Sequence, residues 1–377
     1  MNIRRDVVVT VSLLLASAGT AFAGVLPDDR ADILYHLYDG GGVAIDGPSL
    51  LIRKKVGNSV SIVGNYYVDM VSSASIDVVT TASPYTEKRE QVSLGMDYLR
   101  GNTKMSVSIT NSEESDFTAK SYRFSVSQDM FGDLTTLTLT YSLGDDEVRR
   151  SDDDSFVRYA DRQFYSIGVT QIVTRNLIMG LSVETITDEG FLNNPYRTVR
   201  YLDATSPVGY SYEPELYPNT RTSTAVGIRA RYYLPYRAAI QGEYRFFTDT
   251  WGIISHTGAI SYTHPWGPFT FTGKYRFYTQ DQADFYRDLF PRSEATNFRG
   301  RDKELSQFVS QTFRLQASYE LFSDWNFIEK GTVNFIYDQL LIDYDNFRDL
   351  RSGAPVGQEP LYTLEGGIYQ LFFSFWF

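Results

Sequence analysis

Apolar and polar residues alternate along most of this chain with a period of two, which is typical of β-strands and not of helices. Residues 222–234 show the pattern: Val226, Ile228 and Tyr232 lie on one face, and Arg229 and Arg231 lie on the other. Successive side chains of a strand point to opposite faces of a sheet. The same alternation continues to the last residue, so it predicts one all-β domain.

The alternating segments number sixteen and are bounded by turn residues. They lie near residues 31–38, 48–55, 59–71, 87–99, 103–112, 118–129, 134–143, 162–173, 176–187, 221–233, 237–249, 252–263, 267–279, 307–320, 330–344 and 365–377. The first two are the weakest, and fourteen strands remain if that pair forms a plug or a periplasmic segment instead.

The connections between these segments are short and long in turn. The short ones, such as 56–59, 100–103 and 131–133, carry Gly with Asn or Asp, which tolerate positive φ. The long ones lie near residues 72–87, 144–160, 188–221, 280–306 and 345–364. Short turns on one side and long loops on the other are typical of outer-membrane barrels. We therefore predict a transmembrane antiparallel β-barrel of about sixteen strands.

The two ends of the chain agree with this prediction. Five apolar residues two apart end the chain at a terminal Phe: Tyr369, Leu371, Phe373, Phe375 and Phe377. This is the form of the C-terminal signal that the barrel-assembly machinery reads, and a soluble protein would risk aggregation through such an edge. At the other end, Arg4 and Arg5 precede a short apolar run and the small-x-small site 21–23. Residues 1–23 are predicted to be a cleaved signal peptide, leaving the barrel at 24–377.

Composition narrows the class further. The chain after residue 23 has no long apolar run, which excludes a helical membrane protein, and its 28 Tyr and 25 Phe could form aromatic girdles at the membrane interfaces. The absence of Cys excludes disulfides and thiolate chemistry, and the net charge of −11 argues against nucleic acid as a partner. A large aromatic-rich soluble β-protein of the periplasm is the alternative.

The polar faces of the strands predict the lining of the barrel, because a charge facing lipid costs roughly 2–4 kcal/mol at mid-membrane. The expected lining residues are Arg229, Arg231, Arg237, Glu243, Arg245, Lys274, Arg276 and Arg314. Rings of Arg and Lys in a pore favour anions. In the alternative interpretation, these side chains pair with Glu243, Glu320 and Asp249 and only hold a wet lumen together.

No catalytic, cofactor or metal site is expected. The histidines His36, His256 and His264 are interpreted as interfacial or turn residues, and no Gly-x-Ser-x-Gly motif accompanies them. The acidic residues between 145 and 154 are expected in a solvated loop, with divalent bridging to lipopolysaccharide as the alternative. The chain is therefore predicted not to be an enzyme.

Several short sequences resemble a family of proteobacterial outer-membrane proteins known only as a domain of unknown function. They are Tyr35–Gly42, Tyr66–Asp69, Ser72–Val79, Ala82–Tyr85, Asn193–Tyr196, Arg231–Arg237, Asp249–Gly252 and His264–Gly267. The resemblance implies an outer-membrane β-barrel. Genes of this family often lie beside genes for a small lipoprotein, a thioredoxin-like protein and a flavin transferase, which hints at periplasmic redox or cofactor traffic. The family assigns no role to any residue.

Two main functions follow as expectations. The first is a channel for small solutes, because a sixteen-strand barrel can hold water. The second is a structural or docking barrel for a periplasmic lipoprotein or a thioredoxin-like redox partner, and an outer-membrane hydrolase is a remote third. The other expected partners are outer-membrane lipid, lipopolysaccharide and the barrel-assembly machinery. Loops 188–221 and 280–306 are the expected sites of recognition.

Overall fold

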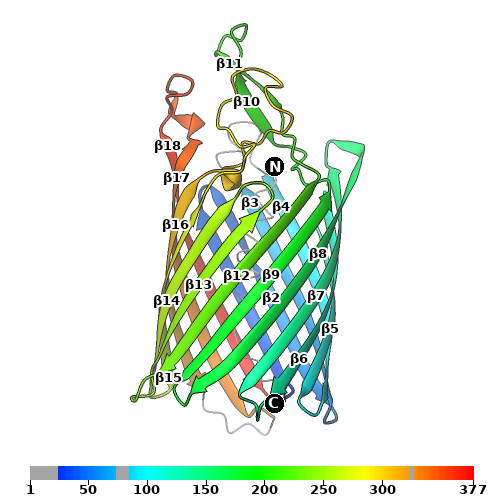
Figure 1. Ribbon diagram of the computed structural model, residues 1–377, viewed down its shortest axis with the longest axis vertical. Helices are drawn as coiled ribbons and strands as arrows, with labels where there is room; N and C mark the ends of the chain where they lie inside the picture. The colour runs from blue at the N-terminus through cyan, green and yellow to red at the C-terminus, as the bar shows by residue number, and fades with distance from the viewer. Residues whose placement is uncertain (1–23, 74–84, 322–326) are drawn as a thin grey trace.

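The computed structural model describes residues 24–73, 85–321 and 327–377, and in it sixteen antiparallel strands close into one barrel (Figure 1). The barrel strands are β1 (Arg30–Gly40), β2 (Val43–Val56), β3 (Val60–Ser73), β4 (Tyr85–Arg100), β5 (Thr103–Glu113), β6 (Phe117–Met130), β7 (Thr135–Arg150), β8 (Asp153–Thr174), β9 (Leu177–Gly190), β12 (Thr220–Tyr233), β13 (Ala239–Asp249), β14 (Ile254–Trp266), β15 (Phe269–Gln280), β16 (Phe308–Leu321), β17 (Lys330–Arg348) and β18 (Leu361–Trp376). Two further strands, β10 (Thr198–Leu202) and β11 (Tyr210–Pro214), form a separate hairpin. Among the described residues, no helix has the length and apolar character needed to cross a membrane.

The prediction of an all-β barrel with sixteen strands is confirmed, and the alternative of fourteen is wrong. The two weakest segments are β1 and β2, and β1 closes the barrel by pairing with β18 from Arg30 opposite Trp376 to Gly40 opposite Gly366. Gly41 and Gly42, both with positive φ, make the two-residue turn between β1 and β2. The N-terminal pair is therefore part of the wall.

The long loops lie together at one end of the barrel, which also carries the two-residue turns β1–β2 and β7–β8, whereas the opposite end carries mainly short turns. The C-terminus lies at the end with the short turns, and the segments 191–219, 281–307 and 349–360 lie at the other end (Figure 1). Because outer-membrane barrels keep their short turns in the periplasm, we call the long-loop end extracellular. The predicted signal peptide and most of the connection 72–87 lie outside the described residues.

The prediction of one long loop is wrong. Residues 144–160 are not a long connection, because β7 runs to Arg150 and β8 starts at Asp153, with Asp145 paired opposite Asp161. A charged strand above the membrane faces water on both sides, so antiparallel pairing continues there without the apolar alternation by which the strand was recognised.

The two faces of the wall follow the predicted alternation. Val226, Ile228 and Leu315 are exposed on the outer face, where lipid would cover them. On the last strand, Tyr369 and Leu371 are exposed on the outer face, whereas Gln370 is buried on the inner one. Since the barrel is closed, no strand edge is left unpaired in the wall.

Candidate pore lining and extracellular cap

The pairing of four neighbouring strands, β12 to β15, brings the predicted basic residues together. Arg229 lies opposite Glu243, which lies opposite Ala259, which lies opposite Arg276, so these residues form one row across the inner wall. The inward residues of β14 are all small: Ser255, Thr257, Ala259, Ser261 and Thr263. Long side chains of β13 and β15 therefore flank a line of short ones.

Of five cations on this wall, three contact two carboxylates. Lys274 Nζ lies 3.0 Å from Glu243 Oε2, and Arg229 Nε lies 3.9 Å from Glu243 Oε1. Arg245 Nη2 lies 3.1 Å from Glu184 Oε2. Two cations have neutral neighbours instead: Arg231 Nε donates a hydrogen bond to Gln241 Oε1 (2.8 Å), and the Arg276 guanidinium lies 5.2 Å from the centre of the Tyr278 ring. We call these five residues the basic ladder: Arg229, Arg231, Arg245, Lys274 and Arg276.

The ladder carries three more positive charges than its two carboxylates, Glu184 and Glu243, can neutralise. The Arg229 side chain is 48% exposed and that of Arg245 43% exposed, so neither is packed away from solvent. This surplus argues against the interpretation in which the basic residues only form a balanced wall of ion pairs.

Two of the predicted basic lining residues lie outside the ladder. Arg314 makes a two-pronged ion pair with the fully buried Asp338, with both N–O distances 2.7 Å. Arg237 lies in the turn between β12 and β13, where its φ is +66°. The expected partners Asp249 and Glu320 pair instead with Arg221 and Lys330.

The structure corrects the interpretation of His36, which is buried on the inner face of β1. Its Nε2 lies 2.8 Å from Asp69 Oδ1 and 3.1 Å from the Tyr67 hydroxyl, and its ring stacks on the Tyr67 ring. The apolar neighbours Tyr35 and Leu37 take the outer face, so His36 must point inward. That period-two signal was present in the sequence.

The other two histidines lie on the outer face of β14. His256 is exposed, and its Nδ1 lies 2.7 Å from the Tyr244 hydroxyl, as the predicted register requires. His264 lies near the end of β14 and not in a turn, because the strand continues to Trp266.

One group of carboxylates among the described residues is close enough to hold a cation. Oxygens of Glu87, Glu114 and Asp116 lie within 4.8 Å of one another. The Ser115 hydroxyl donates to Glu87 Oε1 (2.6 Å), and Arg89 Nε lies 4.0 Å from Glu114 Oε1. Protein groups therefore already contact these carboxylates.

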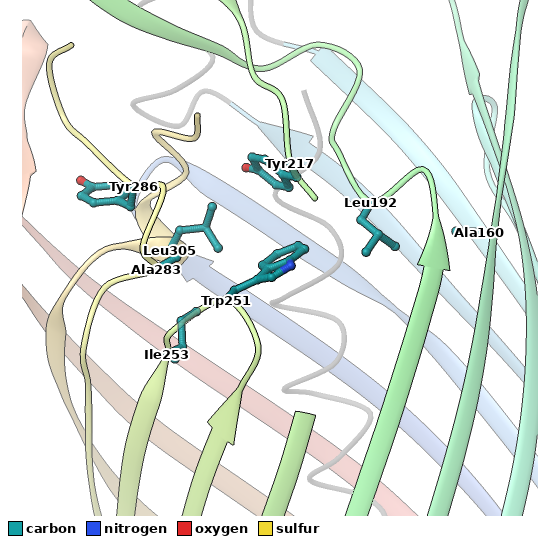
Figure 2. Close-up of a cluster of buried hydrophobic side chains, with 8 residues drawn as sticks. All are labelled: Ala160, Leu192, Tyr217, Trp251, Ile253, Ala283, Tyr286 and Leu305. Carbon is teal, nitrogen blue, oxygen red and sulfur yellow. The ribbon is translucent and has the colours of Figure 1, made fainter. Parts of the chain in front are cut away.

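Loops 191–219, 281–307 and 349–360 pack together into what we call the cap. Its apolar core joins the first two loops to the ends of the wall strands, and Figure 2 shows Trp251 and Tyr217 pointing toward one another. The core residues are Ala160, Leu192, Tyr217, Trp251, Ile253, Ala283, Tyr286 and Leu305. The cap is therefore an ordered, packed structure.

Buried ion pairs join all three loops of the cap. Arg200 is fully buried; its Nη2 lies 2.6 Å from Asp288 Oδ2 and 3.2 Å from Glu359 Oε2. Arg301 Nη2 lies 2.8 Å from Asp288 Oδ1. Burial alone would raise the pKa of Glu359, but hydrogen bonds from Arg200 and the backbone bring that pKa below its usual value. Sequence reasoning missed these partners because they lie 88 and 159 residues from Arg200.

A buried carboxyl of the cap has the opposite shift. Burial, and then repulsion from Asp302, raise the pKa of Glu215 to about 7. Arg197 and two hydrogen bonds oppose this rise: the Tyr217 hydroxyl donates to Oε2 and the Arg301 backbone N–H to Oε1, both at 2.6 Å. Glu215 can therefore change its charge near neutral pH.

Comparisons with solved structures show the fold alone, because sequence identity is low. A bacterial polysaccharide outer membrane secretin aligns with 8% identity over 93% of this chain and 100% of its own, with a TM-score of 0.52. A Pseudomonas aeruginosa FadL homologue aligns with 8% identity over 93% of this chain and 90% of its own, with a TM-score of 0.44. OmpT, an outer membrane protein of Vibrio cholerae, aligns with 10% identity over 93% of this chain and 97% of its own, with a TM-score of 0.43.

No curated protein matches the sequence. One family model matches residues 72–330, which is more than half of the chain. The chain thus has the fold of outer-membrane β-barrels, and it belongs to the family described as "Protein of unknown function (DUF3570)".

Proposed function

We propose that this protein is an outer-membrane channel for small solutes and that it prefers anions. The observation that supports the proposal is the basic ladder on the inner wall, in which three of the five cations contact two carboxylates and the other two have neutral neighbours. Fixed positive charges along a pore raise the local concentration of anions. The net charge of the whole chain is negative, but charges more than about 8 Å from a passing ion are largely screened at physiological salt.

The test is conductance of the purified protein in a planar bilayer. We expect stepwise conductance and, under a salt gradient, a reversal potential that shows anion preference. The double variant Arg229→Gln/Arg231→Gln should lower that preference without unfolding the barrel, because lumen substitutions tune selectivity. Arg237→Gln is the control, since it makes the same kind of substitution in a periplasmic turn and removes one positive charge there. Equal anion preference in all three proteins would contradict the proposal.

A second candidate is a docking barrel, which an apolar part of the inner wall favours. Tyr38, Val43, Ile45, Val71 and Ile368 pack as a buried cluster on strands β1, β2, β3 and β18. Such a wall contributes nothing to the passage of ions. Co-purification of a periplasmic lipoprotein or thioredoxin-like protein from native membranes, together with a protein silent in bilayers at all voltages, would favour this candidate.

A further inference from the structure

The short segment 196–200 touches opposite sides of the barrel. At one end, the Ser151 backbone N–H donates to the Tyr196 hydroxyl oxygen (2.7 Å), and Ser151 lies between β7 and β8. At the other end, Arg200 contacts Glu359, which lies between β17 and β18. In the closed ring, eight strand pairings lead from β17 to β7 in either direction, because the ring has sixteen strands. The two hairpins that carry these contact points therefore stand on opposite sides of the ring.

The span is within reach of so short a segment. The four residue steps from Tyr196 to Arg200 cover at most about 14 Å, and the two side chains extend this at both ends. In Figure 1, β10 stands between the β7–β8 hairpin on one side and the β17–β18 hairpin on the other. Residues 196–200 thus connect the two hairpins at the extracellular end of the barrel.

The two ends are held by contacts of different strength. At the Tyr196 end, the hydroxyl also donates to Ser151 Oγ (3.2 Å), and the Arg150 guanidinium lies 5.7 Å from the ring centre. At the Arg200 end, the buried guanidinium meets two carboxylates and the Asp288 carbonyl oxygen (3.1 Å). Removing one member of a buried ion pair leaves an uncompensated charge, so Arg200 is the stronger attachment.

Backbone pairing adds the loop 281–307 to the same assembly. Leu202 N–H donates to the Phe290 carbonyl (2.9 Å), and Phe290 N–H donates to the Arg200 carbonyl (2.9 Å). Leu216 and Arg299 exchange both of their backbone hydrogen bonds, at 2.9 and 2.8 Å. The loop that supplies Asp288 therefore holds the segment 196–200 at its Arg200 end.

We propose that residues 196–200 are a strap that closes the extracellular mouth, and that release of Arg200 from Asp288 and Glu359 opens the channel. This inference rests on the proposed channel function and adds its regulation. In the closed form, the strap and the cap lie between the external medium and the basic ladder. Opening requires the two carboxylates to be solvated or neutralised when Arg200 leaves.

The test compares single-channel recordings of the full-length protein and its variants. Arg200→Gln should raise the open probability by about tenfold or more, because tenfold needs only ~1.4 kcal/mol and a broken buried ion pair exceeds that. Arg351→Gln is the matched control, since it removes an exposed Arg–Asp349 pair from the same loop 349–360. Tyr196→Phe releases the opposite end without removing a charge and should give a smaller increase.

A disulfide tests whether opening is the movement of the cap. The chain has no Cys, and an antiparallel pair that exchanges both hydrogen bonds has Cα atoms about 5.5 Å apart, which suits a disulfide. Leu216→Cys and Arg299→Cys are therefore added to Arg200→Gln. The oxidised protein should return to the native open probability, and reduction should restore the high one. This reversibility also shows that the variant is folded.

The outcomes separate the two proposals. If the native protein and Arg200→Gln conduct with equal open probability, the channel stands and the strap is refuted. If Arg200→Gln conducts more but oxidation of the cysteine pair changes nothing, the strap is also refuted, because the cap then need not move. If every protein inserts and none conducts under any condition, both the channel and the strap are refuted.

Discussion

Replacing Glu215 by Gln should remove a pH dependence from the cap. The pKa of Glu215 is about 7 in the folded cap and near 4.5 for an ordinary Glu, a difference of about 2.5 units or ~3 kcal/mol. Because the folded pKa is the higher one, the protonated carboxyl favours the closed cap. This contribution is complete below about pH 4.5 and is lost as the pH rises to about 7.

Hydrogen exchange of the cap in detergent measures the effect. The Arg301 N–H donates directly to Glu215, so exchange at this amide reports opening of the cap. After correction for the intrinsic pH dependence of exchange, protection at this site should fall on the order of a hundredfold between pH 5 and pH 8. In Glu215→Gln, the protection should be nearly independent of pH.

The control is Glu294→Gln, because Glu294 is an exposed carboxyl of the same cap. In this variant, the protection of the Arg301 amide should fall between pH 5 and pH 8 as it does in the native protein. The reasoning is refuted if native protection is flat or rises with pH, since Glu215 would then be ionised in the closed cap throughout this range. It is also refuted if Glu215→Gln keeps the full native pH dependence.

Three further predictions concern the wall, the cap and assembly. Asp338→Asn should destabilise the barrel by about 3–5 kcal/mol in urea unfolding, because it leaves Arg314 buried without its carboxylate, whereas Arg314→Met/Asp338→Leu should cost much less; equal losses would contradict this. Trp251→Ala should destabilise the cap by about 3–5 kcal/mol and expose it to trypsin, while the melting temperature of the barrel stays the same. A fall in the melting temperature of the barrel would contradict the separation of cap and wall. Deleting Phe377 should reduce the amount of folded protein in outer-membrane fractions on immunoblots, whereas Phe131→Ala, in an exposed periplasmic turn, should leave it unchanged.

The strand count and the lipid-facing side of each strand could be read from the sequence. Lipid covers one face of the wall and polar surroundings the other, so each strand carries a local alternation, such as Val226, Ile228 and Tyr232 against Arg229 and Arg231. The same alternation predicted the outer face for Tyr369 and Leu371 of β18 and the inner wall for all five residues of the ladder. It failed at 144–160, where the hairpin rises above the membrane and no lipid imposes a pattern.

The cap, the strap and the partners of His36 depended on tertiary structure. Aromatic residues in loops 188–221 and 280–306 indicated order, but nothing local identified Glu359 as the partner of Arg200, because the two lie 159 residues apart. Solvated loops carry no periodic pattern, and many Arg and Glu residues there are equivalent in sequence. Only closure of the ring sets β7 opposite β17. The distance between these two strands across the mouth decides which groups a five-residue segment can join.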